Sequence, residues 1–328
     1  MIAMVTGATG FIGRKLCLAL AQNGTVVHAL CRNEHHPYLI AHSNIIPFKG
    51  DITDSKSLLR AMHGCEQVYH TAALAKMWCS NKNEFYRVNV EGTKNVLEAA
   101  LTAGVNKIVH TSTCGVIGPT HKYPMTETDP RVIGFPIDYE RTKYLAELLV
   151  KEYVQKGMNI VIVNPSRVYG EGPITDSNTV GKMVSGYLKG KWRIVPGDGR
   201  QVANYVYVDD VVKGHIAAME KGVADNRYIL GGEDISFESF FKEVQAISRK
   251  KYQLYKIPQQ WIKLYSRIEK LKTTITGIPP LLLPEFAERL TYDQRYSSHK
   301  AEAQLGYKIT PFRQGIANTV HYFQTQTL

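Results

Sequence analysis

Three glycines near the amino terminus, Gly7, Gly10 and Gly13, constrain this chain more than any other feature. The apolar run 2–6 leads directly into them, which predicts a buried strand, a tight turn and then a helix. Glycine adopts turns that other residues cannot, and without a Cβ it lets backbone amides approach a ligand closely. The first turn of a helix also attracts negative charge. The sequence therefore predicts a phosphate-binding turn here.

A tyrosine and a lysine, Tyr139 and Lys143, stand four residues apart at the start of a predicted helix. Residues at this spacing share one face of a helix. A free tyrosine hydroxyl has a pKa near ~10 and transfers protons poorly at neutral pH, but a neighbouring cation favours its phenolate. Lys143 supplies such a cation. A surface pair that meets by chance is the alternative, and the glycine turn upstream favours a catalytic pair.

Apolar runs alternate with helical patterns through the first half of the chain. The predicted strands are 25–30, 44–48, 67–71, 107–111 and 159–163, and the predicted helices are 14–23, 55–62, 85–103 and 139–156. This alternation predicts an α/β fold with a doubly wound parallel sheet of the Rossmann type. Ligands of such sheets bind beyond the carboxyl ends of the strands.

The alternation loosens after about residue 168, and no second nucleotide motif follows. We expect a dinucleotide-binding domain over 1–169, to which 194–233 return. A smaller substrate-binding part is expected from 170–193 and 234–328.

Composition limits the partners and the compartment. The chain has 40 basic and 29 acidic residues, a net charge of +11, which favours anionic ligands such as nucleotide phosphates, although no nucleic-acid recognition module accompanies it. Five cysteines without Cys-x-x-Cys pairs or a zinc-like histidine spacing indicate a reduced, metal-free protein. A strand that begins at residue 2 leaves no room for a signal peptide, so we expect a cytoplasmic location.

A basic stretch over 242–272 is interleaved with aromatic residues, including Tyr255, Trp261 and Tyr265. It could contact anionic lipid as a peripheral surface. We favour a solvated helix face whose aromatic residues pack on the substrate-binding part, because Pro258 would interrupt a helix. The apolar segment 278–284 could cover an apolar pocket.

Taken together and in this order, these residues resemble the extended short-chain dehydrogenases/reductases, in the branch of dihydroflavonol-4-reductase-like and NAD-dependent epimerase-like proteins. Further matching stretches run along nearly the whole chain, at 50–52, 70–73, 89–93, 164–170, 207–211 and 298–301. The resemblance implies a dinucleotide site formed with Tyr139 and Lys143 by the glycine turn and three later segments. Its residues are Gly7, Thr9, Gly10, Phe11, Ile12, Gly13, Asp51, Ile52, Thr71, Ala72, Ala73, Pro165 and Val168.

The resemblance also implies hydride transfer at a nicotinamide. Tyr139 would move the proton, Lys143 would hold the ribose and tune the tyrosine, and Thr113 would orient the substrate oxygen. A register error of one residue would exchange Thr113 for Ser112. Asn89 would steady the backbone of the active site, and its plainer interpretation is a polar residue inside a helix. For Asp51, which would accept from the adenine, the plainer interpretation is a turn or helix cap.

Two positions bear on the reaction and the cofactor. Dehydratases of this family follow the catalytic threonine with Asp-Glu, whereas Cys114 and Gly115 follow here, which disfavours dehydration. Arg32 after the second strand, without an aspartate at the strand's tip, favours NADP(H), and Glu34 keeps NAD(H) open. We predict an NADP(H)-preferring oxidoreductase of a carbonyl or alcohol substrate, with a possible homodimer. An NAD-dependent sugar-nucleotide epimerase is the alternative, and a redox-silent nucleotide-sensing protein is less favoured.

Overall fold

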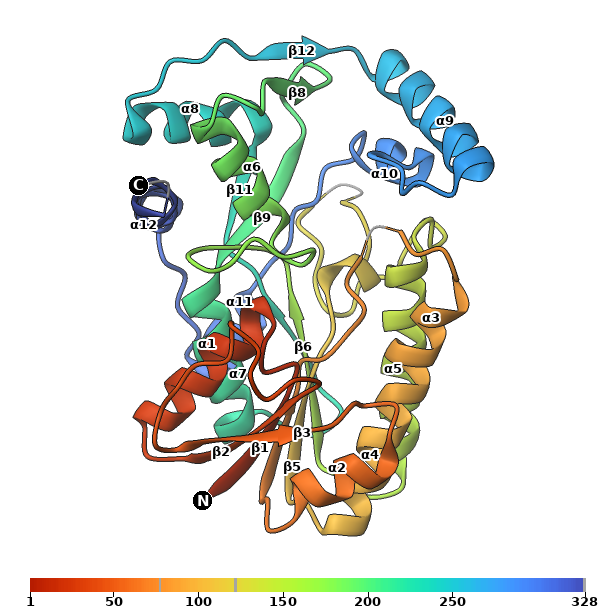
Figure 1. The fold of residues 1–328 in the computed structure, drawn as a ribbon, viewed down its shortest axis with the longest axis vertical. Coiled ribbons are helices and arrows are strands. Elements are labelled where there is room, and N and C mark those ends of the chain that lie inside the picture. Colours follow the sequence, from red (N-terminus) through yellow and green to blue (C-terminus); the bar gives the residue numbers. More distant parts are fainter. Residues whose placement is uncertain (77, 121–122, 327–328) are drawn as a thin grey trace.

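The computed structural model describes residues 1–76, 78–120 and 123–326 and is built around one parallel sheet (Figure 1). The sheet has seven strands in the order β10-β6-β5-β4-β1-β2-β3. The strands are β1 (Ile2–Thr6), β2 (Val26–Cys31), β3 (Ile45–Lys49), β4 (Gln67–His70), β5 (Lys107–Thr111), β6 (Ile160–Pro165) and β10 (Arg227–Leu230). Each neighbouring pair is parallel, so the predicted α/β fold is confirmed.

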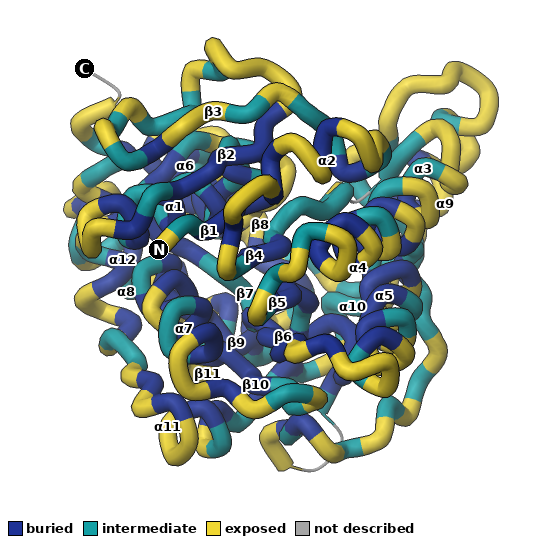
Figure 2. Tube along the Cα trace, turned by 90° about the horizontal axis from the view of Figure 1, so that it is seen from below, coloured by how far each residue is buried: buried dark blue, intermediate teal, exposed yellow. Residues whose placement is uncertain are grey.

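Helices cover both faces of this sheet, and each face has its own apolar core. The first core packs α1 (Phe11–Gln22), α7 (Val208–Lys221) and α11 (His299–Leu305) against the strands. The second packs α2 (Ser55–Met62), α4 (Gly92–Ala103) and α5 (Asp138–Gln155). Seen from below, the strands run as largely buried segments between these helices, except for the edge strand β3, which is mostly exposed (Figure 2). Strands covered on both sides carry apolar residues almost continuously, which is why they were readable in the sequence.

The helix predicted over 85–103 is not uniform. It starts as α3 (Asn83–Tyr86), widens into the π-helical turn η1 (Arg87–Glu91) and continues as α4. It ends at Gly104, as predicted, with that residue in the left-handed conformation at φ 69°. A π-helical turn inserts an extra residue and is common at functional sites. Here the inserted turn contains Asn89.

The rest of the chain forms a second layer above the carboxyl ends of the main sheet (Figure 1). A three-stranded sheet joins β7 (Arg167–Tyr169), β9 (Val202–Tyr207) and β11 (Glu233–Ser236), and β8 (Ile194–Pro196) pairs with β12 (Tyr255–Ile257). A third core lies among α6 (Thr179–Leu188), α8 (Phe237–Ser248) and α12 (Phe312–Thr325). Beside it lie α9 (Gln259–Thr276) and α10 (Pro284–Arg289). The 3-10 turn η2 (Cys114–Val116) follows β5.

The basic stretch differs from its prediction. Pro258 does not interrupt a helix; it is the cap residue from which α9 begins. A proline costs nothing there, because an N–H at the start of a helix has no intrahelical partner. Tyr252, the first aromatic residue of this stretch, does pack on the substrate-binding part, with its ring 5.5 Å from that of Tyr187. Tyr255, Trp261 and Tyr265 do not, since they are 53%, 58% and 43% exposed.

The apolar segment after α9 is also exposed. Ile278 and Leu281 are 52% and 74% exposed, so these two side chains cover no apolar pocket. The local reason is a fold-back onto the helix, in which the Leu281 amide donates to Glu269 Oε2 at 2.9 Å.

Candidate active site

The glycine turn between β1 and α1 is packed too closely for any side chain. A Cβ on Gly13 would lie 2.2 Å from the carbonyl oxygen of Gly7, and one on Gly7 would lie 2.9 Å from the backbone of Ala72. Gly7 also has a positive φ of 70°, and its carbonyl accepts a 2.8 Å hydrogen bond from the Gly10 amide. The turn therefore presents backbone to whatever lies above it, as the spacing of the glycines predicted.

The first turn of α1 is arranged for an anion. Its cap residue, Gly10, offers no side-chain cap, and no acidic residue lies in this turn. Arg14 lies close to this helix end, which repels cations, and its Nε is buried without a hydrogen-bond partner among the described residues. A phosphate group in this place would satisfy both the free amides and the arginine. The sequence analysis missed Arg14, although a cation so near the start of a glycine-led helix was the available signal.

The other predicted cofactor residues lie at the carboxyl ends of the strands. Thr6 pairs with Leu30, which brings the residues after β2, including the exposed Arg32, beside the glycine turn. Asp51 follows β3, where its Oδ1 accepts from the amide and the hydroxyl of Thr53, both at 2.9 Å. One carboxylate oxygen of Asp51 thus stabilises a local turn, which is the plainer of the two roles expected for this residue.

The remaining predicted cofactor residues divide into lining and core positions. Thr71 Oγ1 donates to the Thr6 carbonyl at 2.6 Å, and the Ala72 amide donates to Thr6 Oγ1 at 3.1 Å, so the segment that follows β4 is hydrogen-bonded to the end of β1. Phe11 and Ile52 are buried at 3% and 6% exposure and act as packing residues. Intermediate exposure is shared by Thr9, Ile12, Ala73 and Val168, whereas Pro165 ends β6 buried.

Thr113 and Tyr139 meet above β5. A hydrogen bond links their side chains and lowers the pKa of Tyr139, as does the charge of Arg289, but burial is the larger effect and raises that pKa to about 12. Thr113 Oγ1 accepts from the Gly115 amide at 3.1 Å, which leaves its own proton free to be donated. The pair therefore places a phenol and a hydroxyl donor side by side.

Lys143 lies one helical turn below Tyr139 and is only 1% exposed. Burial lowers its pKa to about 8, against the opposing effect of Glu147. Its Nζ lies 3.3 Å from Nε2 of His110. Burial also lowers the pKa of His110 well below its ordinary value, so this histidine is neutral and adds no second charge. The Lys143 side chain is therefore protonated at neutral pH and loses its charge in mildly alkaline solution.

Asn89 ties two segments of the site together. Its Oδ1 accepts from the Leu74 amide at 2.7 Å, and its Nδ2 donates to Thr142 Oγ1 at 3.0 Å in the first turns of α5. Ser112 does not take the place of Thr113: its Oγ is buried and has no partner among the described residues. The hydrogen bond to Tyr139 thus distinguishes the two hydroxyls that the sequence left in competition.

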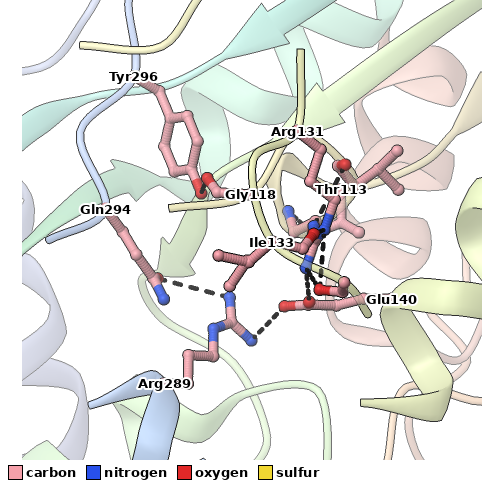
Figure 3. A network of polar contacts seen from close by, with 11 residues as sticks. Thr113, Gly118, Arg131, Ile133, Glu140, Arg289, Gln294 and Tyr296 are labelled. Carbon is pink, nitrogen blue, oxygen red and sulfur yellow. Dashed lines mark hydrogen bonds and ion pairs between the residues drawn. The ribbon is translucent and has the colours of Figure 1, made fainter. Parts of the chain in front are cut away.

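A cavity of about 270 Å³ lies near this pair, although neither Thr113 nor Tyr139 lines it. Gly115 and Glu140, the near neighbours of Thr113 and Tyr139 in the chain, form part of its wall. The remaining wall comes from the residues around Arg131 and from the segment that begins with Glu288. In Figure 3 the two arginines converge on Glu140 from opposite sides.

These three charged residues form one network. Glu140 Oε2 accepts from Arg131 Nη2 at 2.9 Å, and Glu140 Oε1 pairs with Arg289 Nη1 at 3.0 Å. Arg131 also lies over the ring of Phe135, at 4.1 Å. Two cations share the buried Glu140 carboxylate, and Glu288 adds a second carboxylate to the cavity wall, so the formal charges of these four residues balance. Arg289 Nε is buried without a hydrogen-bond partner in the described part of the chain. The sequence analysis missed all three residues, because they share no motif and Arg289 comes from a segment far from the other two.

Similarity to known proteins agrees with this geometry. The model of the NAD dependent epimerase/dehydratase family matches residues 3–231. The chain belongs to this family. It is 31% identical to a putative dihydroflavonol 4-reductase of Synechocystis sp., over 98% of this chain and 94% of that protein. It is 30% identical to sterol demethylase protein B of Methylococcus capsulatus, over 99% and 98%. The crystal structure of gox2253 superimposes with a TM-score of 0.84 at 31% identity, covering 99% of this chain and 98% of that one.

Membership confirms the resemblance to extended short-chain dehydrogenases/reductases and makes the protein a member of an enzyme family that acts on CH–OH groups with a nicotinamide dinucleotide. The chain's own residues fit such a cofactor. The glycine turn is a cradle that a Cβ would fill, and the unpartnered Arg14 Nε lies where phosphates bind.

Proposed function

We propose that this protein is an NADP(H)-preferring oxidoreductase that transfers a hydride to or from a carbonyl or alcohol substrate. The observation that carries the proposal is the hydrogen-bonded pair of Thr113 and Tyr139 above the buried Lys143, next to a cavity. A phenol, a hydroxyl and a cation in this arrangement are what carbonyl reduction needs from a protein. A nucleotide-sensing protein would need the glycine turn alone.

The proposed proton path begins at Tyr139. A nicotinamide dinucleotide held over the glycine turn would supply or accept the hydride at the substrate carbon. During reduction, Tyr139 Oη gives its proton to the carbonyl oxygen, so that C=O becomes CH–OH, and the phenolate then regains a proton from solvent. Thr113 Oγ1 donates a hydrogen bond to the same oxygen and fixes its direction. Lys143 would hold the ribose hydroxyls of the dinucleotide. Its charge would stabilise the Tyr139 phenolate while that phenolate exists.

The cavity wall restricts the substrate. The unpartnered, buried Nε of Arg289 favours a substrate that places a hydrogen-bond acceptor opposite the reacting carbonyl. The volume of about 270 Å³ suits a small to moderate molecule.

The NADP(H) preference rests on the end of β2. Arg32 lies exposed beside the glycine turn, where the 2′ position of the adenosine ribose is expected. An arginine there pairs with a 2′-phosphate, whereas a carboxylate would grip a ribose hydroxyl.

An NAD-dependent epimerase is the second candidate, because the matching family model includes epimerases. Dehydration is less favoured. The Cys114 thiol is buried and donates to the Asn164 carbonyl at 3.1 Å, and Gly115 has no side chain, so neither supplies an acid or a base.

Labelled cofactor tests the proposal. NADPH carrying deuterium at nicotinamide C4 is incubated with the protein and a set of ketones and aldehydes that differ in their polar groups, and the products are analysed by mass spectrometry. We expect deuterium on the carbinol carbon of a product alcohol. Isomerised sugar nucleotide with no net oxidation of the cofactor would instead identify an epimerase.

A further inference from the structure

The helix α9 has an unusual distribution of side chains, because most of its large apolar residues are exposed to solvent. The residues that it turns toward the protein are Ile262, Ser266 and Glu269, and two of these three are polar. Large apolar side chains face away from the protein instead. They are Trp261, Leu264, Tyr265, Ile268, Leu271 and Ile275, at exposures of 58%, 46%, 43%, 55%, 63% and 76%. We refer to these six residues as the apolar stripe.

The stripe is continuous. At about 3.6 residues per turn, positions 261, 264, 268, 271 and 275 lie above one another along a single side of a helix. The loop that follows extends the same surface, because the hydrogen bond from Leu281 to Glu269 holds it against the helix while Ile278 and Leu281 stay exposed. Soluble proteins seldom expose a contiguous apolar surface of this kind without an interaction partner.

Positive charge lies alongside the stripe. Residues 255–276 contain Lys256, Lys263, Arg267, Lys270 and Lys272 but only one acidic residue, Glu269. Lys270 pairs with Glu285 and Lys272 with Glu269, and Lys256 pairs with Glu238. In the part of the chain that the structure describes, Lys263 and Arg267 have no acidic partner. Their charge is therefore available to an anionic surface.

The shape of this region fits a flat partner. α9 stands at the outer edge of the second layer, with α10 beneath it, and forms a ridge (Figure 1). An apolar ridge flanked by lysine and arginine, with a tryptophan and a tyrosine on it, matches the boundary between lipid headgroups and acyl chains. No helix in the described part of the chain is long and apolar enough to cross a bilayer.

We propose that α9 and the loop after it dock on the surface of an anionic phospholipid bilayer. The apolar stripe enters the headgroup boundary, and Lys263 and Arg267 contact lipid phosphates. The docked helix packs against α10, whose last residue, Arg289, lines the cavity. In the docked protein, α10 alone separates the helix that contacts the membrane from the cavity that Arg289 lines. The contact with lipid does not depend on which carbonyl the enzyme reduces.

Vesicle sedimentation tests the proposal on the full chain. We expect the protein to pellet with vesicles of phosphatidylglycerol and phosphatidylcholine, to bind phosphatidylcholine alone at least about tenfold more weakly, and to be released by salt. On binding, the fluorescence of the exposed Trp261 shifts to shorter wavelength, and this shift disappears in Trp261→Phe. No binding to the anionic vesicles overturns the proposal.

Matched variants locate the contact. The double change Leu271→Gln with Ile275→Gln should lower the partition coefficient at least about tenfold, since both side chains lose their apolar burial in lipid. Lys263→Glu with Arg267→Glu should weaken binding to anionic vesicles by a similar factor. Val223→Gln is the control, because Val223 is 60% exposed and lies outside α9.

Leu271 and Ile275 are exposed, so their replacement should leave the fold intact, and unchanged thermal midpoints verify this. Unaltered binding by the Leu271/Ile275 variant overturns the proposal. So does a lipid-free dimer of the wild-type protein that this variant dissociates, because the stripe would then be an interface between two copies of the chain.

Discussion

The cofactor side and the substrate side of this molecule are built by different means. Beneath the cavity, the glycine turn and the strand ends form a site from backbone, with clearances so small that a Cβ on Gly13 would lie 2.2 Å from a carbonyl oxygen. Above it, the side chains of Arg131 and Glu140 form a wall with that of Arg289, which lies far away in the sequence. Backbone sites tolerate few residue types and so leave a readable motif. Side-chain sites leave almost none.

The change Tyr139→Phe separates the two sides most sharply. Removing the phenolic proton should lower turnover about a thousandfold or more, because general acid–base catalysis contributes on that scale. Dinucleotide affinity should stay nearly unchanged, since the glycine turn and the strand ends are untouched. Steady-state rates and a fluorescence titration with NADPH measure the two effects. Substantial turnover by the variant would remove Tyr139 from the mechanism.

The change Gly13→Ala tests the backbone side. The added methyl group has no room against Gly7 and Thr71, so we expect a loss of about 1–3 kcal/mol or more in the free energy of unfolding, and loss of dinucleotide binding. Denaturant unfolding and cofactor titration measure both. Gly134→Ala is the control, because a Cβ at Gly134 meets nothing within 4 Å. A stable Gly13→Ala protein with normal cofactor affinity would contradict the close packing.

The change Arg32→Asp tests the cofactor preference. The variant loses a charge-assisted contact with the 2′-phosphate and gains a carboxylate that repels it. The affinity for NADPH should therefore fall about tenfold to a hundredfold, and the affinity for NADH should change much less. Parallel titrations with the two cofactors give the ratio. Equal losses would show that Arg32 does not contact the 2′-phosphate.

The change Arg289→Gln extends the comparison to the substrate side. The Arg289 charge lowers the pKa of Tyr139, so its removal should raise that pKa and leave less phenolate at any given pH. The pH at which alcohol oxidation reaches half its maximum then moves upward, by up to about one unit, or tenfold in rate at fixed pH. Arg131→Gln is the matched control, since Arg131 also pairs with Glu140 but is not among the groups that shift the pKa of Tyr139. An identical profile for both variants would assign Arg289 a purely structural role.

The smallest effect concerns Lys143 and pH. Its pKa of about 8 lies below the ordinary 10.5, so the lysine is charged below about pH 8 and neutral above it. The value of kcat/KM for reduction should therefore be level near neutrality and fall as pH rises through about 8. In Lys143→Arg, whose guanidinium does not titrate in this range, that fall should be absent, although the level rate is lower. A fall at the same pH in the variant would point to another group.

How far the sequence predicted the structure follows the same division. The sheet, Gly104 as a helix end, and Thr113 beside Tyr139 were predictable, because strand periodicity and glycine positions are local properties of the chain. The π-helical turn around Asn89 was not, since its wider geometry depends on contacts with Leu74 and Thr142. Nor was the outward direction of Trp261, because helical spacing alone does not say which side of a helix meets the protein.

One measurement tests the central claim most directly: the dinucleotide released from freshly purified, denatured protein is identified and quantified, and the emptied protein is titrated with NADPH and NADH. An oxidoreductase exchanges its cofactor at every turnover, so we predict little retained dinucleotide and tighter binding of NADPH than of NADH. NAD retained at close to one molecule per chain would contradict this account, because an epimerase regenerates its cofactor internally and has no need to release it.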